Sequence, residues 1–462
     1  MLSDNNMNNK KIGLVSLGCP KNLVDSEVML GLLKKDGFTL TNNEREANII
    51  IVNTCGFIDD AKQESINAIL EMAELKRENC ELLIVTGCLA ERYNKEILEE
   101  IPEVDAVIGT GHFGDIVETI KKAYSFKLVS SQASEKKPLL YGDLGYYDFD
   151  GTERILSTNN GFAYIKIADG CDNRCTYCII PYLRGPYKSR NMEAIIEEAK
   201  YLVSNGVKEI ILVAQDTTRY GTDLYGERKL KDLVKELSKI SGLKWIRLLY
   251  CYPDQIDDEL IDEIAANDKV CKYIDIPLQH FSDKILKKMG RRSNSAEIEE
   301  LIKKLREKVP EICIRTTFIV GFPGEEEEDF SILCDFVKRM EFDRMGVFMY
   351  SREEGTPAAK LKGQVRKSVK KERFDKLMSI QNEIMIKKNN SRLNKIYDIL
   401  VEGVADDGIF YYGRSYQEAP DIDNLIYFTS GEPLDRGSFV KVKILNIEEY
   451  DLIGVVENEF TE

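Results

Sequence analysis

The chain has little histidine, fewer positive than negative side chains (64 Lys and Arg against 79 Asp and Glu) and no long apolar run. No apolar stretch reaches the eighteen or more residues of a membrane-spanning helix, and the start, MLSDNNMNNKK, lacks the apolar core of a secretory signal. These absences predict a cytoplasmic protein that does not enter a membrane. The formal net charge of −15 disfavours a large phosphate-binding surface, although a local basic patch could exist within it. Only two histidines, His112 and His280, could serve as imidazole metal ligands.

Cysteine, by contrast, is present eleven times. In a reducing compartment, grouped cysteines are better explained as metal ligands or catalytic thiols than as disulfides. The 462 residues exceed one ordinary domain and leave room for two or three, each with its own core. We therefore expect an α/β multidomain protein whose grouped cysteines carry chemistry.

Residues 10–126 predict a parallel-sheet α/β domain, because four β-rich runs, KIGLVSLG, ANIIIVNT, ELLIVTG and VDAVIGT, are each followed by a helical pattern. Cys19, Cys55 and Cys88 stand at or just beyond the ends of three runs. Loops at the carboxyl ends of parallel strands converge, so these thiols could meet as a metal site. The alternative is three small buried hydrophobic side chains, a common fate of free cysteine. Cys80 precedes its run, at the opposite edge of the sheet, and is left out.

Residues 157–390 predict a second α/β domain, a partial (β/α)6 barrel with its chemistry at the carboxyl ends of the strands. The expected strands lie near 163–168, 208–214, 245–250, 272–277, 312–320 and 343–350. A charged helix is expected over about 364–390. Six β/α units favour a partly closed barrel over a doubly wound sheet.

Two further segments have their own character. Residues 125–157, which include SSQASEKKP, lack sustained periodicity and are interpreted as a linker or a peripheral hairpin. Residues 391–462 show several short β-rich runs separated by Gly and Asp turns, a pattern that predicts a small carboxyl-terminal β-barrel.

The most informative motif is IADGCDNRCTYCIIPYLRG, in which three and then two residues separate Cys171, Cys175 and Cys178. A structural zinc ion would need a fourth Cys or His, and neither histidine lies close in sequence, although a remote ligand stays possible. A 4Fe-4S cluster held by three thiolates leaves one iron without a protein ligand, where an exchangeable group can bind. The spacing and the soft all-thiolate shell favour the cluster.

Weaker candidates stand at other strand ends and could contact a nucleotide-like cofactor. They are Gln215 and Asp216 in VAQD, His280 in IPLQH, and Gly321 and Gly324 in FIVGFPGE. Each has a structural alternative: an ordinary strand end, a hydrogen-bonded histidine and a tight turn. Asp25 and Glu27 in NLVDSE could be no more than a solvated first helical turn and are assigned no catalytic role.

The motifs together carry a family resemblance that covers nearly the whole chain. GCDNRCTYC resembles the cysteine loop of radical S-adenosylmethionine enzymes, and the carboxyl-terminal barrel resembles a TRAM domain. With the three-cysteine amino-terminal domain, the chain resembles the methylthiotransferases. SLGCPKNLVDSE, GCDNRCTYCIIPYLRGPYKSR, VAQDTTRYG and IPLQH are similar to the members that modify an aspartate of a small-subunit ribosomal protein. Relatives that modify tRNA tend to carry Gln-Met-Asn after the first cysteine and Gln-Ser-Gly in place of Gln-His.

The resemblance implies two 4Fe-4S clusters, one radical-generating on Cys171, Cys175 and Cys178, and one auxiliary on the amino-terminal cysteines. S-adenosylmethionine would occupy the open iron of the first cluster, and a 5'-deoxyadenosyl radical released from it would attack an unactivated C–H bond. The auxiliary cluster would hold sulfide or polysulfide, to which a second S-adenosylmethionine supplies the methyl group. The cofactors carry the difficult chemistry, so no side chain is expected to be a catalytic acid or base.

The implied product is a methylthio group at the β-carbon of an aspartate. The implied partners are a basic small-subunit ribosomal protein, free or in the subunit, an electron donor such as flavodoxin or ferredoxin, and a sulfur source. Residues 393–462 hold five Lys or Arg against fifteen Asp or Glu, a net charge of −10 that suits a basic partner better than RNA. Asp421 and Asp423 are expected to contribute to this docking surface. The alternatives are the same reaction on a tRNA adenosine and, more remotely, a non-enzymatic metal-stabilised RNA-binding or scaffold protein.

Overall fold

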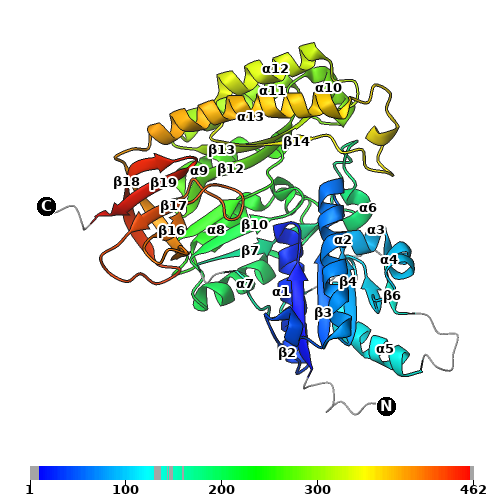
Figure 1. The fold of residues 1–462 in the computed structure, drawn as a ribbon. Coiled ribbons are helices and arrows are strands. Elements are labelled where there is room, and N and C mark those ends of the chain that lie inside the picture. The colour runs from blue at the N-terminus through cyan, green and yellow to red at the C-terminus, as the bar shows by residue number, and fades with distance from the viewer. Residues whose placement is uncertain (1–9, 130–136, 143, 145–148, 159–160, 458–462) are drawn as a thin grey trace. The chain divides into compact units, whose positions relative to one another are not determined.

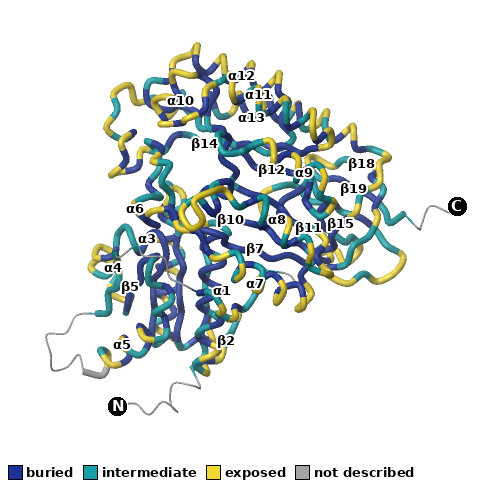
Figure 2. Tube along the Cα trace, turned by 180° about the vertical axis from the view of Figure 1, so that it is seen from behind, coloured by how far each residue is buried: buried dark blue, intermediate teal, exposed yellow. Residues whose placement is uncertain are grey.

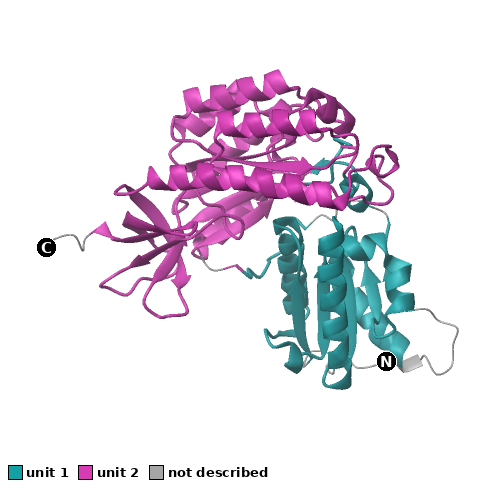
Figure 3. Cartoon of the chain, turned by 45° about the horizontal axis from the view of Figure 1, so that its top comes forward, with its two compact units in different colours: residues 1–157, 169–174, 178–188 teal, residues 158–168, 175–177, 189–462 magenta. Residues whose placement is uncertain are grey.

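The computed structural model describes residues 10–129, 137–142, 144, 149–158 and 161–457. The chain divides into two compact units (Figure 3). The first comprises residues 1–157, 169–174 and 178–188, and the second comprises residues 158–168, 175–177 and 189–462. The predicted linker of residues 125–157 lies partly outside the described residues. No helix in the described ranges is long and apolar enough to cross a membrane.

The first unit is built on a six-stranded parallel sheet with the strand order β2-β1-β3-β4-β5-β6 (Figure 1). Its strands are β1 (Lys11–Ser16), β2 (Thr39–Leu40), β3 (Ile49–Thr54), β4 (Leu82–Gly87), β5 (Ala106–Ile108) and β6 (Leu139–Leu140). The four predicted runs become β1, β3, β4 and β5. β3 and β4 are buried along their whole length, as the continuous apolar runs IIIV and LLIV require of central parallel strands.

Helices flank this sheet and complete the unit. They are α1 (Pro20–Lys35), α2 (Asp59–Glu74), α3 (Cys88–Arg92), α4 (Asn94–Glu100) and α5 (Ile116–Val129). Ile69 of α2 and Ile97 of α4 share one core with Ile50 and Leu83 of the sheet. The short helix α6 (Ile180–Arg184) also belongs to this unit, where Leu183 packs against Cys88.

The second unit contains a six-stranded sheet in which every neighbouring pair is parallel, in the order β14-β13-β12-β11-β10-β7 (Figure 1). The strands are β7 (Phe162–Lys166), β10 (Glu209–Val213), β11 (Trp245–Leu248), β12 (Val270–Gln279), β13 (Cys313–Val320) and β14 (Arg344–Met349). All six expected strands are therefore confirmed. In the described residues β7 and β14 form the two open edges, which confirms a partial barrel rather than a closed one.

Helices connect these strands as the βαβ pattern requires. They are α7 (Met192–Ser204), α8 (Leu230–Ser238), α9 (Asp258–Ala266), α10 (Asp283–Met289), α11 (Ser295–Lys308) and α12 (Glu327–Met340). The predicted charged helix is α13 (Lys367–Asn390), which runs along β14 (Figure 1). β7 and β10 are buried throughout, and exposed residues concentrate on the helices (Figure 2).

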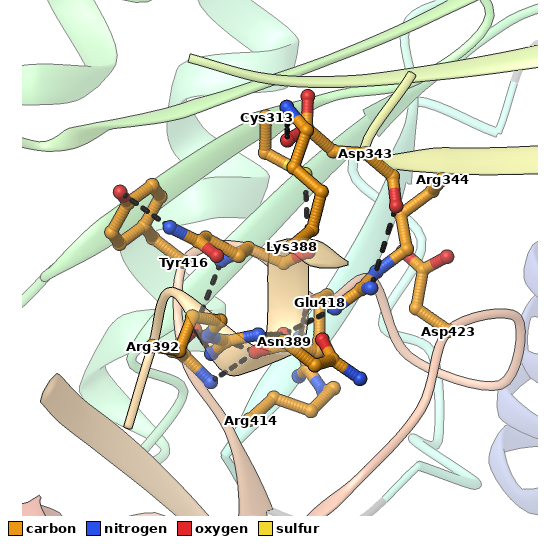
Figure 4. A network of polar contacts seen from close by, with 12 residues as sticks. Cys313, Asp343, Arg344, Lys388, Asn389, Arg392, Arg414, Tyr416, Glu418 and Asp423 are labelled. Atoms are coloured by element: carbon orange, nitrogen blue, oxygen red, sulfur yellow. Dashed lines mark hydrogen bonds and ion pairs between the residues drawn. The ribbon is translucent and has the colours of Figure 1, made fainter. Parts of the chain in front are cut away.

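The carboxyl-terminal segment forms the expected closed barrel, with the strand order β15-β16-β17-β19-β18. Its strands are β15 (Ile396–Val404), β16 (Tyr411–Arg414), β17 (Ile426–Thr429), β18 (Phe439–Glu448) and β19 (Asp451–Val456). Buried ion pairs attach this barrel to the second sheet (Figure 4). Glu418 lies 2.6 Å from Arg344 of β14 and also binds Arg392, while Arg414 lies 2.8 Å from Glu209 of β10.

Candidate functional site

Three cysteines of the first unit directly follow neighbouring strands of its sheet. Cys19 follows β1 and occupies the N-cap position of α1. Cys55 follows β3, and Cys88 follows β4 as the first residue of α3. Because β1, β3 and β4 are adjacent and parallel, the three thiols stand at the same carboxyl edge of the sheet. This is the edge at which open α/β sheets bind their ligands.

Glycines beside these cysteines bring their loops into contact. Gly18 has φ +91°, and a Cβ atom placed on it would lie 2.9 Å from Cβ of Cys55. A Cβ atom on Gly56 would lie 2.9 Å from the carbonyl carbon of Cys88. Only glycine permits both approaches without displacing backbone or a cysteine. The sequence therefore packs the three cysteine-bearing loops against one another.

The three thiols differ in how readily they ionise. Burial opposes ionisation of Cys19, but the charges of Lys21 and Arg184 and backbone N–H groups at the start of α1 lower its pKa overall. Burial, together with the negative charges of Cys88 and Cys19, raises the pKa of Cys55 to about 12. Burial also raises the pKa of Cys88, although Arg184 acts in the opposite direction. The three thiols thus interact electrostatically. A positively charged metal centre would favour the thiolate form of all three.

The donor set suits an iron-sulfur cluster better than one metal ion. In the described part of the chain, no three His, Cys, Asp or Glu side chains come close enough to share a single ion. A four-iron cluster is wider than one ion and is held by thiolates at its corners. Three thiols at one sheet edge are ligands of the type that such a cluster takes, and a cluster at this site stays a prediction.

The second cysteine set lies on a loop that contributes residues to both units. In the first unit, the backbone N–H of Cys171 donates to the carbonyl of Gly185 at 3.1 Å. In the second unit, Sγ of Cys175 lies 3.0 Å from the hydroxyl of Tyr252, at the carboxyl end of β11. The guanidinium of Arg291 lies 3.8 Å from the centre of the Tyr252 ring and 4.0 Å from Sγ of Cys175. A hydroxyl and a cation therefore face this buried sulfur.

Two of the predicted cofactor contacts follow β10. Gln215 is partly buried, and Asp216 is fully buried. The Asp216 carboxylate accepts a hydrogen bond from Thr218 at 2.7 Å. Both residues thus lie at the carboxyl edge of the second sheet, where the sequence placed them, and their contact with a cofactor stays a prediction.

The other three predicted contacts follow β12 and β13 and have strong local structural roles. His280 is fully buried, and its Nδ1 accepts the N–H of Ser282 at 3.0 Å. The Glu325 carboxylate accepts the N–H of Gly321 at 2.7 Å, which closes a tight turn. A Cβ atom on Gly321 or Gly324 would lie within 2.3 Å of Cγ of Lys370 or Nζ of Lys288, respectively. Gly321 and Gly324 also have φ values of +72° and +81°, which is why this turn favours glycine. A role toward S-adenosylmethionine stays a prediction.

Comparison with known families matches three stretches of the chain. Residues 11–109 match an uncharacterized protein family, UPF0004, residues 165–337 match the radical SAM superfamily, and residues 395–456 match the TRAM domain. The chain is 62% identical to the ribosomal protein uS12 methylthiotransferase RimO of Acetivibrio thermocellus, over 97% of this chain and 99% of that protein. It belongs to the RimO family. The RimO protein of a Thermoanaerobacter species is 54% identical over 96% of this chain and 99% of its own length.

Solved structures resemble the RimO-family chain in fold alone. The radical S-adenosylmethionine methyltransferase TsrM of Kitasatospora setae aligns with a TM-score of 0.56 and 15% identity, over 76% of this chain and 77% of that one. The cobalamin-dependent radical enzyme OxsB aligns with a TM-score of 0.51 and 14% identity, over 82% and 56%. Membership in the RimO family confirms the resemblance carried by the four motifs, and it implies a 4Fe-4S cluster and S-adenosylmethionine as cofactors.

The interpretation of Asp25 and Glu27 as a solvated helical turn is wrong. Both carboxylates are buried, because distant segments cover them. Arg184 lies 3.0 Å from Asp25, and the backbone N–H of Ser157 donates to Glu27 at 2.8 Å. The two carboxylates bind α1 to distant segments of the first unit. That neither is catalytic stays a prediction.

Sequence reasoning also missed Arg184, Tyr252 and Arg291. Arg184 stands in the quoted motif PYLRG, directly after the cysteine loop, which was the available signal. Tyr252 and Arg291 are far from the loop in sequence, and no local pattern marks them. Only the folded sheet brings them to Cys175.

Proposed function

We propose that this chain transfers a methylthio group to the β-carbon of an aspartate in ribosomal protein uS12. The observation that carries the proposal is the presence of two separate three-cysteine sets, one after adjacent strands of the first sheet and one on the loop of Cys171, Cys175 and Cys178. Relatives with at least 50% identity over nearly the full chain bear the name of a uS12 methylthiotransferase.

In this proposal each cysteine set holds one 4Fe-4S cluster with an open iron. When bound, the two clusters and S-adenosylmethionine supply a carbon-centred radical, a sulfur atom and a methyl group. The protein holds these groups in place and shields them from water. Tyr252 donates a hydrogen bond to the thiolate of Cys175, since a metal-bound thiolate has no proton to give. Gln215, Asp216, His280, Gly321 and Gly324 are proposed to surround the S-adenosylmethionine.

The acidic barrel is proposed to dock the basic substrate protein. The expectation that Asp423 belongs to this surface is wrong, because its side chain is only 3% exposed. It accepts a hydrogen bond from Tyr273 at 2.8 Å and lies 3.4 Å from Arg315. Asp421 is exposed, but it accepts a hydrogen bond from Tyr164 at 3.3 Å. The exposed acids Asp406 and Glu432, on turns of the barrel, are better placed to meet a partner.

The reaction also needs reducing equivalents and sulfur from outside the chain. We propose a small electron-carrier protein such as flavodoxin or ferredoxin as the electron donor, and a separate sulfur source that reloads the auxiliary site. Both assignments follow from the family chemistry rather than from a binding surface of this chain.

The proposal is tested by anaerobic reconstitution of the full chain with iron and sulfide. The reconstituted protein is incubated with S-adenosylmethionine, a chemical reductant and sulfide, and with either purified uS12, small ribosomal subunits or tRNA. Mass spectrometry should find the methylthio group on an aspartate of uS12, and no methylthio-adenosine in tRNA. Modified tRNA with unmodified uS12 would favour the alternative tRNA activity, and the absence of bound iron would favour the scaffold alternative.

A further inference from the structure

A buried arginine lies beside the amino-terminal cysteines. Arg184 ends α6, and its side chain is only 2% exposed. Its Nη1 donates to Asp169 at 2.9 Å, and its Nη2 donates to Asp25 at 3.0 Å and to Oδ1 of Asn22. Sγ of Cys88 donates to the same Asn22 oxygen at 3.9 Å. The guanidinium and the Cys88 sulfur thus share one acceptor.

Packing fixes Arg184 in this position. Ile179 and Leu183, at the start and near the end of α6, form a buried apolar cluster with Cys88. The hydroxyl of Thr110 donates to the carbonyl of Leu183. Because α6 is held at both ends, the guanidinium cannot swing into solvent without dismantling this cluster. A buried, immobile charge acts on its neighbours with little screening.

The charge of Arg184 reaches all three thiols. Asn22, which binds this arginine, also binds Cys88 and donates to the carbonyl of Thr54, the neighbour of Cys55. Asn22 stands in the first turn of α1, whose N-cap is Cys19. Arg184 therefore makes the electrostatic potential at the three sulfur atoms more positive than Asp25 and Asp169 alone would make it.

We propose that Arg184 raises the reduction potential of the cluster held by Cys19, Cys55 and Cys88, a cluster that itself rests on the proposed function. The relevant step adds one electron to the cluster, with no bond formed or broken. Net charge and hydrogen bonds to the sulfur atoms are what set such potentials, and a buried cation stabilises the more negative, reduced form. Arg184 is thus a positioning residue of the auxiliary site and not only a link between α1 and α6.

The experiment isolates the auxiliary cluster in the full-length variant Cys171→Ala, Cys175→Ala, Cys178→Ala. After anaerobic reconstitution, iron is counted and the cluster is titrated with dithionite under electron paramagnetic resonance detection. Adding Arg184→Gln should lower the ratio of reduced to oxidised cluster about tenfold at the parent midpoint, equivalent to about 59 mV for one electron. Arg184→Lys retains the charge and should restore most of the shift. Asp25→Asn, an isosteric change, should move the midpoint in the positive direction.

The outcomes separate the two claims. If the parent triple variant binds no iron, the second cluster fails and the role of Arg184 fails with it. If the cluster assembles but Arg184→Gln and Asp25→Asn both leave its midpoint unchanged, Arg184 is purely structural and the proposed function stands. If Arg184→Gln does not assemble a cluster, Asp25→Asn decides: a positive shift supports the proposal, and an unchanged midpoint overturns it.

Discussion

The hydroxyl of Tyr252 lies 3.0 Å from Sγ of Cys175, and the guanidinium of Arg291 lies over the phenol ring, 3.8 Å from its centre. This sulfur belongs to the loop that the family assigns to the radical-generating cluster. A hydrogen bond to a cluster thiolate stabilises the reduced state, because reduction adds negative charge to the cluster and its sulfur ligands. The Tyr252 hydroxyl should therefore influence the first step of the reaction, the reductive cleavage of S-adenosylmethionine.

Tyr252→Phe should slow the reductive cleavage of S-adenosylmethionine about fivefold, since a typical hydrogen bond contributes about 1 kcal/mol. The substitution removes only the hydroxyl and keeps the ring that Arg291 contacts. The measurement is 5'-deoxyadenosine formed per minute under limiting reductant, with the midpoint potential of the cluster. Tyr220→Phe is the matched control, because it removes a buried hydroxyl that bonds to the carbonyl of Arg190 instead. Equal effects of the two substitutions would contradict a role at the cluster.

The two cysteine sets should be separable by mutation. Replacing Cys171, Cys175 and Cys178 by Ala should leave about four irons per chain and abolish S-adenosylmethionine cleavage, with the iron number taken from the cluster type. Replacing Cys19, Cys55 and Cys88 by Ala should also leave about four irons and retain cleavage to 5'-deoxyadenosine, but yield no methylthio product. Iron analysis and product chromatography check both. Bound zinc, or methylthio product from the second variant, would contradict the assignment of the sets.

Gly18→Ala should damage the auxiliary site selectively. The new Cβ would lie 2.9 Å from Cβ of Cys55, on a backbone with φ +91°. We expect a loss of about 1–3 kcal/mol in unfolding free energy and of auxiliary iron, with S-adenosylmethionine cleavage retained. Gly151→Ala is the control, since its φ is +76° but nothing lies within 4 Å of the added atom. If the control loses as much iron, backbone strain alone and not the contact with Cys55 is responsible.

The attachment of the barrel should depend on pH through Glu418. Although burial opposes its ionisation, Arg392 and Arg344 lower the pKa of Glu418 to about 2. Because this value lies below that of an unfolded glutamate, the stabilisation is fully present above about pH 4.5 and is lost as pH falls toward 2. Glu418→Gln should lower the unfolding free energy of the apoprotein by about 3–5 kcal/mol near pH 7, because two buried arginines lose their shared partner.

Denaturant unfolding of the apoprotein between pH 3 and 7 checks this prediction. The difference between the parent and Glu418→Gln should shrink at the acidic end of the range. Glu432→Gln, at an exposed turn of the same barrel, should change neither the stability nor its pH dependence. A constant difference between parent and Glu418→Gln at all pH values would mean that the carboxylate's charge does not hold the barrel.

The parts of the molecule that sequence reasoning predicted are those encoded locally. The runs that became β3 and β4 are continuous and apolar, and the cysteine loop carries its spacing within eight residues. The environment of Asp25 was not predictable in this way, because its partner Arg184 is 159 positions away. Asp423 was misjudged for the same reason: its partner Tyr273 is 150 positions away. A charged residue is usually solvated, so a sequence predicts that it lies on the surface. A partner distant in the sequence can bury it, and only the fold reveals that partner.

The last prediction concerns recognition of the substrate by the barrel. Asp406 and Glu432 are exposed residues of its turns, so reversing both to Lys should weaken binding of uS12, and the weakening should be largest at low ionic strength. Production of 5'-deoxyadenosine without substrate should be unchanged, because neither residue is assigned to a cofactor site. Titration of labelled uS12 at two salt concentrations measures the effect.

Asp423→Lys is the informative contrast: it places an ammonium opposite Arg315, so it should destabilise the barrel rather than act on binding alone. Equal uS12 affinity of the parent and the double reversal would show that these carboxylates only keep the protein soluble.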